Sequence, residues 1–158
     1  MSVEKVKEYL KQWGKEGGVR VFNASSATVE LAAEALHTAE KRIAKSLAFA
    51  KNDGAILVVA AGDAKIDNRA FKDTFKMKAK MLDPERTYEL TGHKVGGVCP
   101  FAIPEEVEIY LDASLKRFDT VFPACGSANS AIELKVEELY TISRATSWVD
   151  VCKGWQDA

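Results

Sequence analysis

The 158-residue chain has few of the residues that build disulfide frameworks and metal sites. It contains three cysteines, Cys99, Cys125 and Cys152, and two histidines. An odd number of widely spaced cysteines argues against a disulfide framework. Cys-x-x-Cys and His-x-x-x-His spacings are absent, which argues against a structural zinc site. We therefore expect no metal and no other cofactor, and a reducing, cytoplasmic compartment.

Long apolar runs and an excess of one charge are also missing. No stretch approaches the length that spans a bilayer, so no membrane partner is expected, and the N-terminal sequence is unlike a signal peptide. With 22 Lys and Arg against 23 Asp and Glu, the net charge is −1. This balance excludes a globally basic nucleic-acid binder, although a local basic patch stays open. Apolar residues make up 47% of the chain, enough for the core of a single domain over residues 1–158.

The spacing of apolar residues predicts helices and strands without strict alternation. Helices are expected over residues 3–13, 29–36, 68–77, 84–90 and 136–143. Strands are expected over residues 19–22, 43–49, 55–61, 107–111, 120–123, 132–134 and 147–151. Asn52-Asp53-Gly54 predicts a tight turn between two of these strands. The intermixed order favours the α+β class.

One segment, from Thr91 to Phe101, is poor in side chains and stiff at its end. It contains Gly92, Gly96, Gly97 and Pro100. Glycine lets the backbone take positive φ and lets a ligand come close, while proline fixes φ. Such a loop suits a substrate carbonyl or phosphate. Taken alone, the same residues more often form a tight structural turn.

Four motifs in a fixed order resemble the YbaK-like, EbsC-type family of prolyl-tRNA-synthetase-associated editing domains. The motifs are Thr28-Val29-Glu30-Leu31-Ala32-Ala33, Lys45-Ser46-Leu47, Gly96-Gly97-Val98-Cys99-Pro100-Phe101, and Gly126 ahead of Ile132-Glu133-Leu134. The resemblance spans roughly residues 26–151. It implies a mixed, twisted, partly barrel-like sheet of about six or seven strands with surrounding helices. It also implies hydrolysis of mischarged aminoacyl-tRNA in trans.

The resemblance assigns catalytic roles to Lys45, Gly96, Gly97 and Pro100. The Lys45 ammonium would hold the terminal phosphate or the ester carbonyl, and the loop N–H groups would hold the developing oxyanion. The attacking water would be positioned by this loop and by the ribose hydroxyl of the last nucleotide. From the residues alone, a lysine on an apolar strand also fits a side chain that reaches the surface along its stem.

Six further residues are expected to bind substrate. Val98 and Cys99 suggest a small pocket, which favours alanine, serine, threonine or cysteine. In the loop of Gly126, Ser127 and Asn129, relatives often carry a basic pair that this chain lacks at Ser127-Ala128. Ser127 and Asn129 can still hydrogen-bond a ribose or phosphate, or can simply form a turn.

The sixth residue, Asp63, follows a strand. It can meet the substrate's α-ammonium group or cap a turn, and the turn is the commoner role. Other residues invite functional interpretations that we weight less. A nucleophile and base pair of Cys99 and His93 lacks a third orienting group. Lys72, Lys76, Lys78 and Lys80 form either a solvated face or a contact for the tRNA backbone.

The leading hypothesis is therefore a trans-editing deacylase for a mischarged tRNA, with tRNA(Pro) and a small non-cognate amino acid expected. Its partners would be the acceptor end of the tRNA and, less directly, a tRNA synthetase. One alternative is a non-catalytic module of the same family that binds tRNA ends or a synthetase. Another is a small-molecule ester or thioester hydrolase that uses Cys99.

Overall fold

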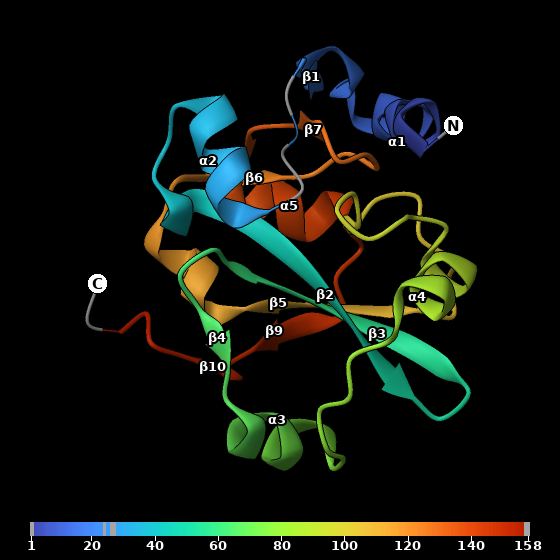
Figure 1. The fold of residues 1–158 in the computed structure, drawn as a ribbon, viewed down its shortest axis with the longest axis vertical. Coiled ribbons are helices and arrows are strands. Elements are labelled where there is room, and N and C mark those ends of the chain that lie inside the picture. The colour runs from blue at the N-terminus through green and yellow to red at the C-terminus, as the bar shows by residue number, and fades with distance from the viewer. Residues whose placement is uncertain (1, 24, 26–27, 157–158) are drawn as a thin grey trace.

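A computed structural model describes residues 2–23, 25 and 28–156 of this chain (Figure 1). Its α-helices are α1 (Ser2–Leu10), α2 (Val29–Leu36), α3 (Asn68–Phe75), α4 (Pro84–Thr91) and α5 (Val136–Ile142). In the view of Figure 1, α1, α2 and α5 lie above the long strands and α3 lies below them. No helix in the described ranges is long and apolar enough to cross a membrane.

A six-stranded mixed sheet forms the centre of the fold. Its strands, in spatial order, are β8 (Leu134–Lys135), β6 (Thr120–Pro123), β2 (Ile43–Lys51), β3 (Gly54–Ala61), β5 (Glu108–Asp112) and β9 (Ser147–Val149). β2 pairs antiparallel with β3 and parallel with β6, while β5 is parallel to both of its neighbours. The expected α+β class with a mixed, curled sheet is confirmed.

Two short strand pairs supplement this sheet. β1 (Arg20–Val21) pairs with β7 (Ser130–Ala131), and β4 (Lys65–Ile66) pairs with β10 (Cys152–Lys153). The first pair anchors the segment before α2 to the loop after β6. The second pair ties the C-terminal segment to the turn that follows β3.

The β2–β3 hairpin forms where the sequence predicts it. Asn52, at φ 54°, and Asp53 form a two-residue turn, the loop length typical of tight hairpins. From Ile56 to Ala61 every residue of β3 is fully buried, because helices and loops cover both faces of this central strand. β2 is only partly covered, and that difference creates room for a site beside it.

Several element boundaries differ from the sequence prediction; the helix expected over 3–13, for example, ends as an α-helix at Leu10 and continues as a 3-10 turn over Lys11–Trp13. α3 ends at Phe75 because Lys76 adopts the left-handed conformation and closes the helix. The expected strand over 147–151 stops at Val149, since the N–H of Val151 donates to the Asp112 carboxylate instead of a ladder partner. Of the expected strand over 132–134 only Leu134 lies in a strand, β8, because β7 ends before it at Ala131.

The α2 helix packs on the sheet through a stripe of small side chains. Thr28 caps its first turn by accepting the N–H of Leu31. Its buried face meets the start of β2 and the middle of β6 in a cluster made by Ala32, Ala33, Leu36, Ile43, Phe122 and Ala131. This packing holds α2 beside the exposed part of β2 and forms one wall of a cavity.

Candidate functional site

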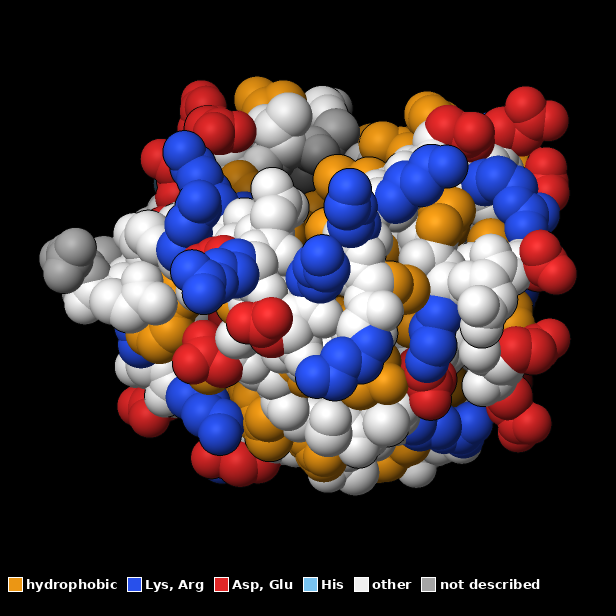
Figure 2. Space-filling model, turned by 90° about the horizontal axis from the view of Figure 1, so that it is seen from below, with side chains coloured by type: hydrophobic (Ala, Val, Ile, Leu, Met, Phe, Trp, Pro, Cys, Tyr) orange, Lys and Arg blue, Asp and Glu red, His pale blue; other side chains and the backbone are white. Residues whose placement is uncertain are grey.

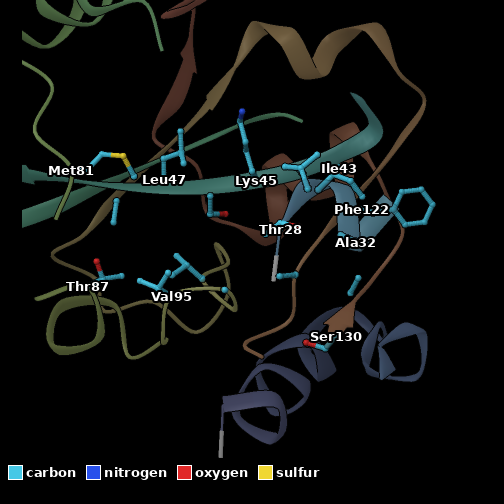
Figure 3. Close-up of a pocket in the computed structure, with 18 of the residues that line it drawn as sticks. Thr28, Ala32, Ile43, Lys45, Leu47, Met81, Thr87, Val95, Phe122 and Ser130 are labelled. Carbon is cyan, nitrogen blue, oxygen red and sulfur yellow. The ribbon is translucent and has the colours of Figure 1, made fainter. Parts of the chain in front are cut away.

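A cavity of about 290 Å³ lies against β2 (Figure 3). Its walls come from α2, from the glycine loop (residues 91–101), from the segment that contains Met81 and Leu82, and from the chain between β6 and β7. The lining is mostly apolar: Val29, Ala32, Ile43, Ala44, Leu47, Ala48, Met81, Leu82, Val95, Val98, Phe122, Ala124 and Ala131. Thr28, Lys45, Ser46, Thr87, Gly96 and Ser130 also line it. The side chains of Met81 and Val95 are 59% and 60% exposed and mark its mouth.

The two glycine-containing loops of the predicted site lie in direct contact. A Cβ atom built on Gly97 would fall 2.6 Å from the backbone nitrogen of Ser127 and 2.7 Å from the carbonyl carbon of Gly126. No side chain fits there, so the sequence requires glycine at this position because of loop packing. Gly126 itself takes φ 93°, which glycine adopts without strain.

The glycine loop presents two main-chain donors with no partner. The N–H of Gly97 donates to the carbonyl of Lys94 at 2.9 Å and closes a turn within the loop. Gly96, at φ 97°, lines the cavity together with Val98. Within the described part of the chain, neither the Gly96 nor the Val98 N–H has a hydrogen-bond acceptor. These two groups, rather than that of Gly97, are available to an oxyanion.

Lys45 lies on β2 and contributes to the cavity wall, but its ammonium group is engaged elsewhere. It donates to the main-chain carbonyls of Ala64 and Gly62 in the turn after β3. Figure 3 shows its side chain leaving β2 on the side opposite to Thr87 and Val95. Burial lowers the pKa of this ammonium, while the nearby charge of Asp63 favours its protonated form.

Asp63 is held in a two-pronged ion pair. Its carboxylate accepts from the two terminal nitrogens of Arg117 at 2.6 and 3.0 Å, and these hydrogen bonds hold its pKa below the usual value. The carboxylate does not line the cavity. The Asp63 carboxylate therefore binds the Arg117 guanidinium and not the ammonium group of a substrate in this cavity.

Cys99 and His93 are neighbours inside the protein and both are fully buried. The Nε2 atom of His93 lies 2.8 Å from the carbonyl of Phe101 and 3.5 Å from the Cys99 sulfur. A carbonyl oxygen can only accept, so Nε2 carries the proton and cannot take one from the thiol. Burial raises the pKa of the Cys99 thiol to about 12. This pair has neither the thiolate nor the base that a cysteine nucleophile needs.

Pro100 is buried on the side of the loop away from this cavity. It borders a second hollow near the C-terminus of α5, together with Tyr9, Ile103 and Arg144. Cys99 and Pro100 are therefore behind the surface that Gly96 and Val98 present. Their positions allow them to stiffen the loop without touching a ligand in the first cavity.

Ser127 and Asn129 hold the neighbouring loop in place. The Asn129 amide donates to the carbonyl of Phe22 at 2.9 Å, and the Phe22 N–H donates to the carbonyl of Asn129 at 2.7 Å. The Ser127 hydroxyl lies 2.8 Å from both the Asn129 side-chain oxygen and the Ser130 hydroxyl. This network connects the Gly126 loop to β1, which explains its turn-forming composition without a ligand.

The structure thus gathers Lys45, Gly96 and Val98 around one cavity and places Gly97 and Gly126 directly behind it. Sequence reasoning missed Thr28, Ser46, Thr87 and Ser130 as polar lining residues. Thr28 and Ser46 carried a signal, because both stand in motifs of the family resemblance, and Ser46 follows Lys45 on a predicted strand and so faces the opposite side of the sheet. In the described residues, no three His, Cys, Asp or Glu side chains come together as a metal site.

A row of exposed lysines leads toward the mouth of this cavity. Lys76, Lys78 and Lys80 are exposed, whereas the intervening Met77 and Ala79 are partly buried against the core. The segment then pairs with β2, and Met81 lies opposite Phe49. Figure 2 shows the face that carries α3, where Lys and Arg side chains recur. The described salt bridges include none of these three lysines.

Comparison with known proteins identifies relatives of this architecture. The model of the family described as "Aminoacyl-tRNA editing domain" matches residues 23–142. The chain is 55% identical to "Uncharacterized protein YwhH" of Bacillus subtilis (strain 168), over 99% of this chain and 100% of that protein. It is 27% identical to a proline–tRNA ligase of Geobacillus sp. (strain WCH70), over 78% of this chain but 22% of the ligase.

A solved structure described as a candidate trans-editing enzyme for prolyl-tRNA synthetase has the same fold. It superposes with a TM-score of 0.86 at 28% identity, over 97% of this chain and 98% of that one.

Proposed function

Because the chain belongs to the aminoacyl-tRNA editing domain family, we propose that it is a free-standing deacylase that hydrolyses the ester of a mischarged tRNA. Its substrate is tRNA(Pro) carrying a small non-cognate amino acid. The likeness to proline–tRNA ligases and to the candidate trans-editing enzyme supports the choice of tRNA. The observation that carries the proposal is the small apolar cavity lined by Gly96 and Val98, whose N–H groups have no hydrogen-bond acceptor among the described residues.

In this proposal the glycine loop stabilises the transition state. Water adds to the ester carbonyl carbon, and the oxyanion that forms accepts the N–H groups of Gly96 and Val98. Each such donor contributes roughly 3 kcal/mol to lowering the barrier. The C–O bond to the ribose then breaks, and the proton of the attacking water passes to the departing ribose oxygen. The neighbouring ribose hydroxyl positions the water, so no protein nucleophile is required.

Lys45 and the lysine row bind the nucleotide part of the substrate. For this the Lys45 side chain has to turn away from the Gly62 and Ala64 carbonyls, which lie on the side of β2 opposite to Val95. Its ammonium then binds the terminal phosphate or the ester carbonyl, because a charged donor forms stronger hydrogen bonds with an anion. Lys76, Lys78 and Lys80 contact the acceptor-end backbone as it approaches the cavity mouth. Ser127 and Asn129 shape this end of the site, where the chain lacks a basic pair.

The size of the cavity favours a small amino acid. Ala32, Ala44, Ala48 and Val98 line it, and their short side chains leave room for a few heavy atoms beside the ester. An apolar pocket distinguishes one methyl group by only about 1–3 kcal/mol. Several small amino acids are therefore expected to be substrates, with rates that differ by about one to two orders of magnitude.

The competing function is a non-catalytic module that binds tRNA ends or a synthetase. The missing basic pair at Ser127-Ala128 is the observation that favours it. The two functions differ in turnover. Purified protein should deacylate at least one member of a panel of tRNA(Pro) charged with alanine, serine, threonine or cysteine, and Lys45→Ala should lose this activity at least about a hundredfold while staying folded. Tight tRNA binding without deacylation of any member would support the module instead.

A further inference from the structure

One edge of β2 is unpaired over a short stretch beside the cavity. β6 pairs with β2 only at Ile43 and Ala44. Farther along, the Ala50 N–H donates to the carbonyl of Lys80, and the Ala48 carbonyl accepts the N–H of Leu82. Between these two contacts lie residues 45–47. In the described part of the chain, no neighbouring strand covers this stretch of the edge.

The alternation of a β-strand decides which residue faces the gap. Ala48 and Ala50 direct their main-chain groups away from β3, and main-chain directions repeat every second residue. Ser46 therefore directs its N–H and its C=O into the gap, and Ser46 and Val59 form a non-hydrogen-bonded pair of the hairpin. No described residue contributes a hydrogen bond to these two groups.

The Ser46 hydroxyl also lacks a hydrogen-bond partner among the described residues, and its oxygen is buried. Buried polar groups of a native protein are nearly always paired, because an unpaired one costs roughly 1–3 kcal/mol. One residue of the cavity wall thus combines an unpaired N–H, an unpaired C=O and an unpaired hydroxyl. A ligand that pairs with them would recover this cost.

We infer that the main chain of Ser46 binds the aminoacyl group of the substrate as if it were one residue of an antiparallel strand. An α-amino ester carries an ammonium donor and a carbonyl acceptor on adjacent carbons. A strand residue that forms a hydrogen-bonded antiparallel pair offers the same two groups in the same order. The α-ammonium donates to the Ser46 carbonyl, and the ester carbonyl accepts the Ser46 N–H. The bound amino acid fills the gap between β6 and the segment at Leu82.

This binding mode rests on the proposed function and refines two parts of it. The ester carbonyl oxygen has two lone pairs, so Ser46 can hold one while one N–H of the glycine loop holds the other, and the oxyanion gains a third lone pair for the second loop N–H. The ammonium is recognised by a main-chain carbonyl, since the Asp63 carboxylate is occupied by Arg117. Recognition through the main chain leaves the choice of side chain to the walls of the cavity, whose small size favours a small amino acid.

Substitution by proline tests the donor directly. Ser46→Pro removes the N–H from an edge that makes no ladder bond there, so the sheet should tolerate it. Ser147 provides the matched control. The Thr146 N–H donates to Ile109, so the next N–H, that of Ser147, faces the open edge of β9 away from the cavity. Ser46→Pro should raise KM about tenfold, whereas Ser147→Pro should not change it.

Ser46→Ala separates the hydroxyl from the main chain. It should raise KM only about threefold, because both main-chain groups remain. An equal loss in Ser46→Ala and Ser46→Pro would assign the effect to the hydroxyl and overturn the inference. Thermal melting of all three variants shows whether each is folded. A Ser46→Pro protein that is folded and has the wild-type KM would also overturn it.

A second measurement does not depend on turnover. The probe is adenosine with alanine linked through a 3′-amide, which retains the ammonium and the carbonyl but is not hydrolysed. Its binding should shift the Ser46 amide resonance and slow hydrogen exchange at that amide. An N-acetylated probe, which lacks the ammonium, should protect it less.

If the Ser46 amide is protected but no mischarged tRNA is hydrolysed, the binding site stands and the catalytic function fails. If tRNA is hydrolysed but the probe leaves this amide unchanged, the inference fails and the function stands.

Discussion

Substituting alanine for Gly97 tests whether contact between the two glycine-containing loops builds the site. The added Cβ would meet three backbone atoms of Gly126 and Ser127 at 2.6–2.7 Å. Backbone cannot rotate away as a flexible side chain can, so the loops must separate by several tenths of an ångström. Overpacking of this kind costs about 1–3 kcal/mol. Each kcal/mol lowers the melting temperature of a chain of this length by roughly 2–4 °C.

The same displacement should slow catalysis more than it weakens tRNA binding. Gly96 and Val98 move with Gly97, and a misplacement approaching 1 Å costs on the order of a hundredfold in rate. Lys76, Lys78 and Lys80, which we propose contact the tRNA backbone, lie on another segment and stay in place. Single-turnover deacylation, measured beside tRNA affinity, separates the two effects.

Gly17→Ala is the control for this experiment. A methyl group added at Gly17 would meet no atom within 4 Å, and Gly17 has no positive φ, so its variant should keep the stability and the rate of the wild type. If Gly97→Ala melts at the wild-type temperature and deacylates at the wild-type rate, the contact between the loops does not shape the site. The oxyanion role of the loop would then have to be abandoned.

Two further predictions concern the buried pair behind the loop. Cys99→Ser should retain most of the activity, and mass spectrometry of the wild type should find no acyl-enzyme, because a thiol with a pKa of about 12 stays protonated at neutral pH. Abolished turnover together with a trapped adduct would contradict this mechanism. The second prediction concerns stability and pH: burial lowers the pKa of His93 in the folded protein, so the unfolded chain takes up the proton first as the pH falls. Stability should therefore decrease below the unfolded pKa of about 6.5, and urea unfolding of wild type and His93→Gln at pH 7.5 and 5.5 should show a smaller decrease for the variant.

Much of the fold could be predicted from local patterns. Apolar periodicity located the helices and the long strands to within a few residues, and Asn52-Asp53-Gly54 located the hairpin. These features depend on neighbours in the sequence. The boundaries that differed depend on distant contacts instead: the carboxylate of Asp112 binds the N–H of Val151 and ends a strand 39 positions away. No local pattern could have indicated that.

The sequence by itself determined which residue types stand in the loops, the balance of charge and the family to which the chain belongs. It could not show that Gly97 is packed against Gly126, because the two are joined only through the fold of the sheet. Nor could it show that the Arg117 guanidinium forms an ion pair with the Asp63 carboxylate. It also could not show that Cys99 is buried beside His93, whose Nε2–H donates to the carbonyl of Phe101. The open edge at Ser46 is a property of strand order, since it exists only where β6 ends and the segment at Leu82 begins. Hydrogen bonds and packing between distant segments form only once the chain has folded, and tertiary structure alone decides which donors are left for a substrate.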